Sequence, residues 1–204
     1  YKTINVKGNT DLTVKAESDR IEKFDASAFT ATLDYTYKPL ASTPIGATNV
    51  VKGGSSKDII NLDFKDLAVA NKTNFEIDGG AGRDELNVKY LKADENKFTV
   101  NNVEKVDIHR VEGSTAANKL HTMDFGGSDV THLHTNAFKD NLKVTNSTIK
   151  SVTVDKVRPD DDGNVTAAPW GTTQFTNGYL EEINVTNTVD AQNPQGEAII
   201  DPTI

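Results

Sequence analysis

The sequence predicts an all-β fold, and three observations carry this prediction. Apolar and polar residues alternate over short stretches, as in 4–6, 12–14 and 152–154, with the two-residue period of a β-strand. Glycine, asparagine and aspartate interrupt these stretches every few residues, as turns do. Hydrophobic residues make up only 36% of the 204 residues, so we expect a thin core and a large surface, which is typical of stacked repeat folds.

A degenerate repeat, apolar-x-x-apolar-x-apolar, indicates how the strands are arranged. The last three of its five copies begin 46 and 31 residues apart, so no fixed period is established. We predict an irregular right-handed parallel β-helix or β-roll-like stack with long loops, in which 1–204 form a single elongated domain. An antiparallel β-sandwich with the same alternation is the alternative. The copies begin at Tyr1, Ile21, Val103, Ile149 and Leu180.

Two segments are expected to leave this regular body as loops. The first lies near 38–49 and contains two prolines. The second, 158–171, contains two prolines, an acidic triplet and the only tryptophan. Prolines and clustered polar residues favour irregular backbone over strands.

The charge balance narrows the choice of partners. The net charge is −8 and the pI is near 5.0, and no basic stripe is present to replace counterions around phosphates, so nucleic acid is not an expected partner. An acidic chain favours cations or a basic or neutral surface. No apolar run approaches the ~20 residues that a membrane-spanning helix needs.

We also expect the chain, which starts at Tyr1, to be a fragment of a larger protein.

The absence of cysteine excludes disulfides, cysteine nucleophiles and thiolate metal sites. Secreted proteins without disulfides often use metal ions to fix their loops. This favours a calcium-type site.

Two glycine-rich segments are the candidates for that site. The segment 78–87 matches Gly-Gly-x-Gly-x-Asp-x-apolar-x, with Asp84 in the aspartate position. The segment 53–61 has Asp58 there, and Ser56 replaces its third glycine. Each segment leads into a short apolar stretch.

Calcium chemistry explains these residue types. Ca²⁺ takes six to eight oxygen ligands. Glycine adopts the positive φ angles that turn backbone carbonyls inward, and an aspartate at the end of the turn supplies a carboxylate. The two copies begin 26 residues apart, a plausible length for one coil, so stacked turns would let one ion bridge Asp58 and Asp84, with Asp78 close by. The alternative is that both segments are ordinary glycine-rich turns between strands.

These segments resemble the calcium-binding nonapeptide of RTX proteins, and the wider pattern resembles bacterial surface-layer proteins and adhesins exported by type I systems. The resemblance implies the ligands: the carboxylates of Asp58 and Asp84, and turn carbonyls at Gly53, Gly54 and Ser55 and at Gly79, Gly80 and Ala81. A typical RTX roll has tandem nonapeptides, whereas this chain has two separated copies. We therefore expect isolated calcium sites in a β-helix.

Other candidates are weaker. Asp160 and Asp162 form a possible second acidic site or a solvated loop, and Trp170 and Tyr179 form a possible sugar-stacking or interface pair. On a strand, His132 and His134 would share a face, but no third zinc ligand stands at a diagnostic spacing.

The function expected from the sequence is structural, not enzymatic. It is a Ca²⁺-binding domain of a secreted bacterial cell-surface protein of the surface-layer type, which self-associates, contacts neighbouring subunits or attaches to cell-surface polysaccharide. An adhesin or glycan-binding module is the alternative, and a polysaccharide-active enzyme on a β-helix is the third reading. No nucleophile elbow, zinc-protease helix or phosphate loop is present.

Overall fold

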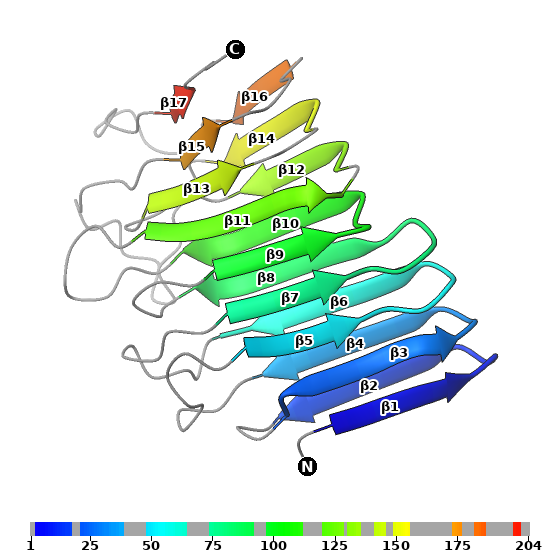
Figure 1. Ribbon diagram of the computed structural model, residues 1–204. Helices are drawn as coiled ribbons and strands as arrows, with labels where there is room; N and C mark the ends of the chain where they lie inside the picture. Colours follow the sequence, from blue (N-terminus) through cyan, green and yellow to red (C-terminus); the bar gives the residue numbers. More distant parts are fainter. Residues whose placement is uncertain are drawn as a thin grey trace.

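The fold is a β-solenoid, seen in a computed structural model (Figure 1). The structure describes residues 3–17, 21–38, 48–64, 74–91, 97–111, 120–128, 130–135, 141–145, 149–155, 173–176, 182–186 and 198–200. Within these ranges all regular structure is β-strand. Every strand pairing is parallel, which confirms the predicted stack and rules out the antiparallel sandwich.

Two sheets form the sides of the stack, and successive strands alternate between them. The first sheet contains β1 (Thr3–Gly8), β3 (Lys23–Phe29), β5 (Thr48–Lys52), β7 (Asn74–Asp78), β9 (Lys97–Asn101), β11 (Leu120–Gly127), β13 (Asn141–Thr145), β15 (Thr173–Thr176) and β17 (Ala198–Ile200). The second contains β2 (Leu12–Glu17), β4 (Leu33–Lys38), β6 (Asp58–Asp63), β8 (Glu85–Leu91), β10 (Lys105–Val111), β12 (His132–Thr135), β14 (Ser151–Asp155) and β16 (Glu182–Thr186). One odd and one even strand therefore make a coil.

The register of the second sheet explains the uneven repeat spacing. Val106, Val152 and Ile183, from the three clearest copies, lie in one column, with Leu133 between the first two. The 46-residue spacing therefore spans two coils, and the 31-residue spacing spans one. The coils differ in length because their connections differ, whereas the strands keep their register.

The core is a thin layer between the sheets. Inward-facing residues alternate with outward-facing ones in strands such as β6, where Ile60 and Leu62 are buried and their neighbours are partly exposed. Aromatic rings stack through this layer: Phe24 lies against Tyr35 with ring centroids 3.7 Å apart, and Phe75 against Phe98 at 5.4 Å. Such burial is the main stabilising term of the fold.

The segment predicted to be a loop at 38–49 is flanked by strands. Lys38 ends β4 and Thr48 begins β5, and 39–47 lie outside the described residues. The predicted loop 158–171 also lies outside them. Within the described ranges, no helix is long and apolar enough to span a membrane.

Candidate functional site

The two glycine-rich turns lie one above the other in the stack. The first joins β5 to β6 and the second joins β7 to β8. The flanking strands pair in register, with Ile59 opposite Glu85. The turns also contact each other directly, because Ala81 N donates a hydrogen bond to Gly54 O at 3.0 Å. The 26-residue offset is therefore one coil, as the sequence predicted.

Glycine is required where the turns touch. A Cβ at Gly79 would lie 2.0 Å from the carbonyl oxygen of Asn102, and a Cβ at Gly53 would lie 2.1 Å from that of Gly79. At Gly80 the backbone has a φ of +94°, and a Cβ would lie 2.1 Å from Gly54 O. Side chains are therefore excluded by backbone of the adjacent coil and, at Gly80, by the left-handed conformation as well.

The two aspartates are buried, and each caps a backbone amide in the preceding coil. Asp58 is 0% exposed and Asp84 is 1% exposed. Asp58 Oδ1 accepts a hydrogen bond from Leu33 N at 3.1 Å, and its Oδ2 accepts one from Gly54 N at 2.5 Å. Asp84 Oδ1 accepts one from Asp58 N at 2.8 Å. The structure thus brings the two predicted residues together through a carboxylate–amide bond.

A third carboxylate, which sequence reasoning missed, extends this arrangement. Glu104 Oε2 accepts a hydrogen bond from Asp84 N at 2.6 Å. Asp58, Asp84 and Glu104 form what we call the carboxylate column. The signal in the sequence was that Glu104, like Asp84, stands just before a strand of the second sheet, but the turn before Glu104 lacks the glycine motif.

Asp84 Oδ2 is a buried carboxylate oxygen without a hydrogen-bond partner. Three buried side-chain polar atoms in the described residues lack a hydrogen-bond partner, and Asp84 Oδ2 is the one carboxylate oxygen among them. Burial raises the pKa of Asp84 to about 7, and the nearby Asp58 and Glu104 carboxylates add to the rise. Burial also raises the pKa of Asp58, although its amide bonds oppose the rise. An ionised Asp84 is therefore a costly buried charge.

One backbone carbonyl oxygen and the unpaired Asp84 Oδ2 lie on the same side of the second turn, at Gly79. The carbonyl oxygen of Asn102 and Asp84 Oδ2 both lie against Gly79, within 2.0 and 2.7 Å of the position that a Cβ would take. Carboxylate and carbonyl oxygens are the ligand types that Ca²⁺ prefers. No group of three or more His, Cys, Asp or Glu suited to a metal occurs among the described residues, so such a site would depend on backbone carbonyls.

Asp78 lies beside the turn rather than in the column. Its Oδ1 accepts hydrogen bonds from Asn102 Nδ2 at 2.7 Å and from Gly80 N at 3.2 Å. Gly80 N therefore bonds to Asp78 and not to Asp84, whereas the corresponding Gly54 N bonds to Asp58. Asp84 Oδ2 therefore lacks the amide bond that its counterpart in Asp58 accepts, and it has no hydrogen-bond partner.

The remaining predicted residues fall into two groups. In the turns, Ser55 and Ala81 are exposed, and Ser55 N donates to Phe29 O at 3.0 Å. Asp160, Asp162, Trp170 and Tyr179 lie outside the described residues.

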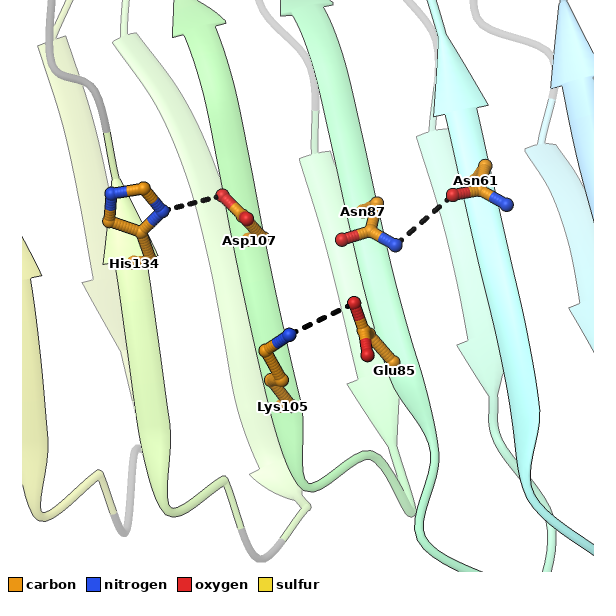
Figure 2. Close-up of polar contacts among 6 residues, drawn as sticks. All are labelled: Asn61, Glu85, Asn87, Lys105, Asp107 and His134. Carbon is orange, nitrogen blue, oxygen red and sulfur yellow. Dashed lines mark hydrogen bonds and ion pairs between the residues drawn. The ribbon is translucent and has the colours of Figure 1, made fainter.

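The outer face of the second sheet carries side-chain contacts between coils (Figure 2). Asn87 Nδ2 donates to Asn61 Oδ1 at 3.1 Å, and Asn61 Nδ2 donates to Asp34 Oδ1 at 2.9 Å; we call these three residues the amide ladder. Farther along the sheet, His134 Nδ1 lies 2.9 Å from Asp107 Oδ1. These pairs support the register of the stack.

Histidine placement also follows the strand pattern. His132 and His134 share the outer face of β12, as expected, and His132 Nδ1 lies 3.3 Å from Ser151 Oγ. His121 is buried in the core.

Together, the fold and turns define a parallel β-solenoid whose stacked glycine-rich turns carry buried carboxylates. Comparison with known proteins finds no protein-family model, no curated protein and no solved structure that matches the chain.

Proposed function

We propose that this chain is a structural domain of a secreted bacterial cell-surface protein, of the surface-layer type, that calcium stabilises at Asp84 and that takes part in assembly or surface attachment. Its role is to provide a stiff, regular stack rather than to catalyse a reaction. The observation that carries the proposal is the buried, unpaired Asp84 Oδ2 in the stacked turns.

The parallel stack supports a structural role. Each coil contacts only its neighbours, so the stack can present a long, regular surface from a short sequence. The described part of the column also supports this role, because Asp58 accepts backbone hydrogen bonds through both of its carboxylate oxygens. Buried carboxylates in this arrangement order the backbone and are shielded from a substrate.

The electrostatics of the turn support calcium. Asp84 Oδ2 together with backbone carbonyls such as that of Asn102 would hold the ion, which would supply the positive charge that an ionised Asp84 lacks. Binding to the folded chain alone would add stability, about 2.7 kcal/mol when free calcium is 100 times the dissociation constant. An extracellular location fits this linkage, because calcium would then favour the compact state outside the cell.

A calcium titration of thermal unfolding tests the proposal. Wild type is compared with Asp84→Asn and with Asp124→Asn, a matched control that removes one charge from β11, where Asp124 Oδ1 accepts from Gly126 N at 3.0 Å. We expect calcium, relative to chelator, to raise the melting temperature of wild type and Asp124→Asn but not of Asp84→Asn. Magnesium serves as the specificity control because it demands a stricter octahedral geometry. A wild type that melts identically in calcium and chelator contradicts the proposal.

A further inference from the structure

Two cations lie next to each other at the tips of the stacked glycine-rich turns, which share one edge of the stack (Figure 1). Lys57 and Arg83 are exposed, and each stands directly before the buried aspartate of its turn. Because Asp58 N bonds to Asp84 Oδ1 and the strands that follow pair in register, the two cations occupy the same position in adjacent coils. Adjacent coils lie about 4.8 Å apart, so two like charges are neighbours on this edge.

The Lys57–Arg83 neighbourhood departs from the charge pattern of the sheets. Where two Asp, Glu or Lys residues pair in register on described strands, their charges have opposite signs. These pairs are Glu17–Lys38, Asp25–Lys52, Lys52–Asp78, Asp63–Lys89 and Glu85–Lys105. Opposite charges support the stacking of strands, whereas like charges oppose it. A local arrangement that opposes the fold is typical of a functional position.

Neither cation neutralises the carboxylate column. Among the residues that the structure describes, Lys57 and Arg83 have no ion-pair or side-chain hydrogen-bond partner. The bonded oxygens of Asp58 and Asp84 accept from backbone amides. Burial and neighbouring carboxylates raise the pKa of Asp84, and no cation is among the causes of its shift. Both positive charges are therefore available to a bound anion.

The edge formed by the short turns is locally basic, although the whole chain has a net charge of −8. In the described turns that lead from odd to even strands, the exposed charged residues are Asp11, Lys57, Arg83 and Lys150. Asp11 Oδ1 is already occupied, since it accepts a hydrogen bond from Thr32 N at 3.0 Å. A negatively charged partner can therefore approach this edge more readily than the rest of an acidic chain.

We propose that Lys57 and Arg83 bind an acidic polysaccharide, with one carboxylate-bearing sugar at each coil. The sugar units of an extended pyranose polymer repeat at nearly the spacing of the coils, so adjacent carboxylates would meet adjacent cations. The exposed neighbours Ser55, Ala81 and Gly82 are small and leave room for the sugar rings. The inference deepens the proposed function by naming the attachment surface; it rests on the proposed surface attachment but not on calcium.

A polymer fits this pair of cations better than a single small anion or a nucleic acid. Two exposed cations hold one small anion only weakly, because water and salt screen their charges. Many copies can bind along one polymer, which raises the overall affinity. Proteins that bind duplex DNA neutralise several phosphates, and the described short turns carry no exposed aromatic side chain on which a base could stack.

Binding to immobilised polygalacturonate, measured by surface plasmon resonance at low ionic strength, tests the proposal. Chelator is present throughout, because calcium could otherwise bridge the protein and the polymer. We expect the wild-type chain to bind polygalacturonate but not dextran, a neutral polymer. Lys57→Gln and Arg83→Gln should each raise the dissociation constant several-fold, and the double variant should lose detectable binding.

The matched control is Lys89→Gln/Lys97→Gln, which also removes two exposed positive charges but toward the ends of β8 and β9 that are far from these turns. The control should bind polygalacturonate as the wild type does. Arg83→Lys should also bind, because it keeps the charge. Equal loss in the control, or full binding by Lys57→Gln/Arg83→Gln, would overturn the proposal. A DNA duplex bound as tightly as polygalacturonate would overturn the choice of a polysaccharide.

Urea unfolding separates a binding site from a structural role. Removal of the like-charge contact should leave Lys57→Gln/Arg83→Gln at least as stable as the wild type. A loss of stability together with binding would overturn the proposal.

The calcium response separates this inference from the proposed calcium site. Lys57→Gln/Arg83→Gln should keep the rise in melting temperature that calcium gives the wild type. Asp84→Asn should lose that rise and still bind polygalacturonate in chelator. Failure of the calcium response therefore leaves polymer binding standing, and absence of polymer binding leaves the calcium response standing.

Discussion

Asp84 Oδ1 accepts a hydrogen bond from the backbone amide of Asp58 at 2.8 Å, so the aspartate of one glycine-rich turn holds the residue that follows the other. The two oxygens of Asp84 therefore differ: Oδ1 is part of the backbone network, whereas Oδ2 has no protein partner. The same carboxylate thus holds two coils together through Oδ1 and leaves Oδ2 free for a proton or a cation that neutralises its charge.

The hydrogen bond itself is tested by comparing Asp84→Ala with Asp84→Asn. Both variants remove the charge, but asparagine keeps an acceptor for the Asp58 amide. We expect Asp84→Ala to be less stable by about 1–3 kcal/mol, the cost of leaving a buried amide unpaired. Urea unfolding in chelator measures the difference, and equal stabilities would contradict the role of Oδ1.

Close packing of the turns makes Gly79 sensitive to any side chain. Gly79→Ala would force a Cβ to within 2.0 Å of Asn102 O and 2.7 Å of Asp84 Oδ2. We expect a loss of roughly 2–4 kcal/mol, as in other overpacked or strained sites. Ser55→Ala, an exposed change in the other turn, should have little effect. A tolerated Gly79→Ala would show that this turn does not pack against Asn102.

Asp84 should also give stability a distinctive pH dependence in chelator. Burial raises its pKa from 3.8 to about 7, so between these values the folded chain holds a proton that the unfolded chain releases. The contribution of this group to stability is greatest below about pH 4 and falls as the pH rises toward 7.

Between pH 5 and 8, wild type should therefore lose stability relative to Asp84→Asn, by at most roughly 3 kcal/mol. Urea titrations of both proteins at the two pH values give this difference, from which groups distant from Asp84 cancel. A difference that does not change with pH would mean that Asp84 stays ionised throughout.

The amide ladder predicts a further stability effect. Asn87→Asp would replace the donor to Asn61 Oδ1 with an acceptor and would add negative charge one coil from Asp107. We expect a loss of about 1 kcal/mol, measured by urea unfolding above pH 6. Asn87→Ser, which keeps a donor without adding charge, should lose less; an Asp variant as stable as wild type would contradict the ladder.

Much of the fold could be predicted from alternation alone. The short apolar stretches that follow the glycine-rich turns form strands, in which Ile60 and Leu86 are 1% and 0% exposed. The stacking of the two turns also followed from their motif and their 26-residue offset. Coil boundaries elsewhere could not be predicted. Leu133 lies between Val106 and Val152 in the sheet, but its neighbours in sequence do not follow the apolar-x-x-apolar-x-apolar repeat. The 46-residue spacing therefore gave no sign that it covers two coils.

The direction of the carboxylates was beyond sequence reasoning. The motif places an aspartate at the end of a turn, but it does not state whether the oxygens face an ion or the amides of the preceding coil. That outcome depends on the neighbours that stacking supplies, such as the amides of Leu33 and Asp58. Glu104 was missed for the same reason, since its role exists only once the coils are stacked.

The most direct measurement is the difference in unfolding free energy between wild type and Asp84→Asn at pH 8, in chelator and in calcium. In chelator the buried charge should make wild type the less stable protein, because asparagine removes the charge and retains an acceptor for Asp58. In calcium the order should reverse, with wild type the more stable. The same difference in both conditions would contradict calcium binding at Asp84 and leave the carboxylate column as a hydrogen-bonding feature of the stack alone.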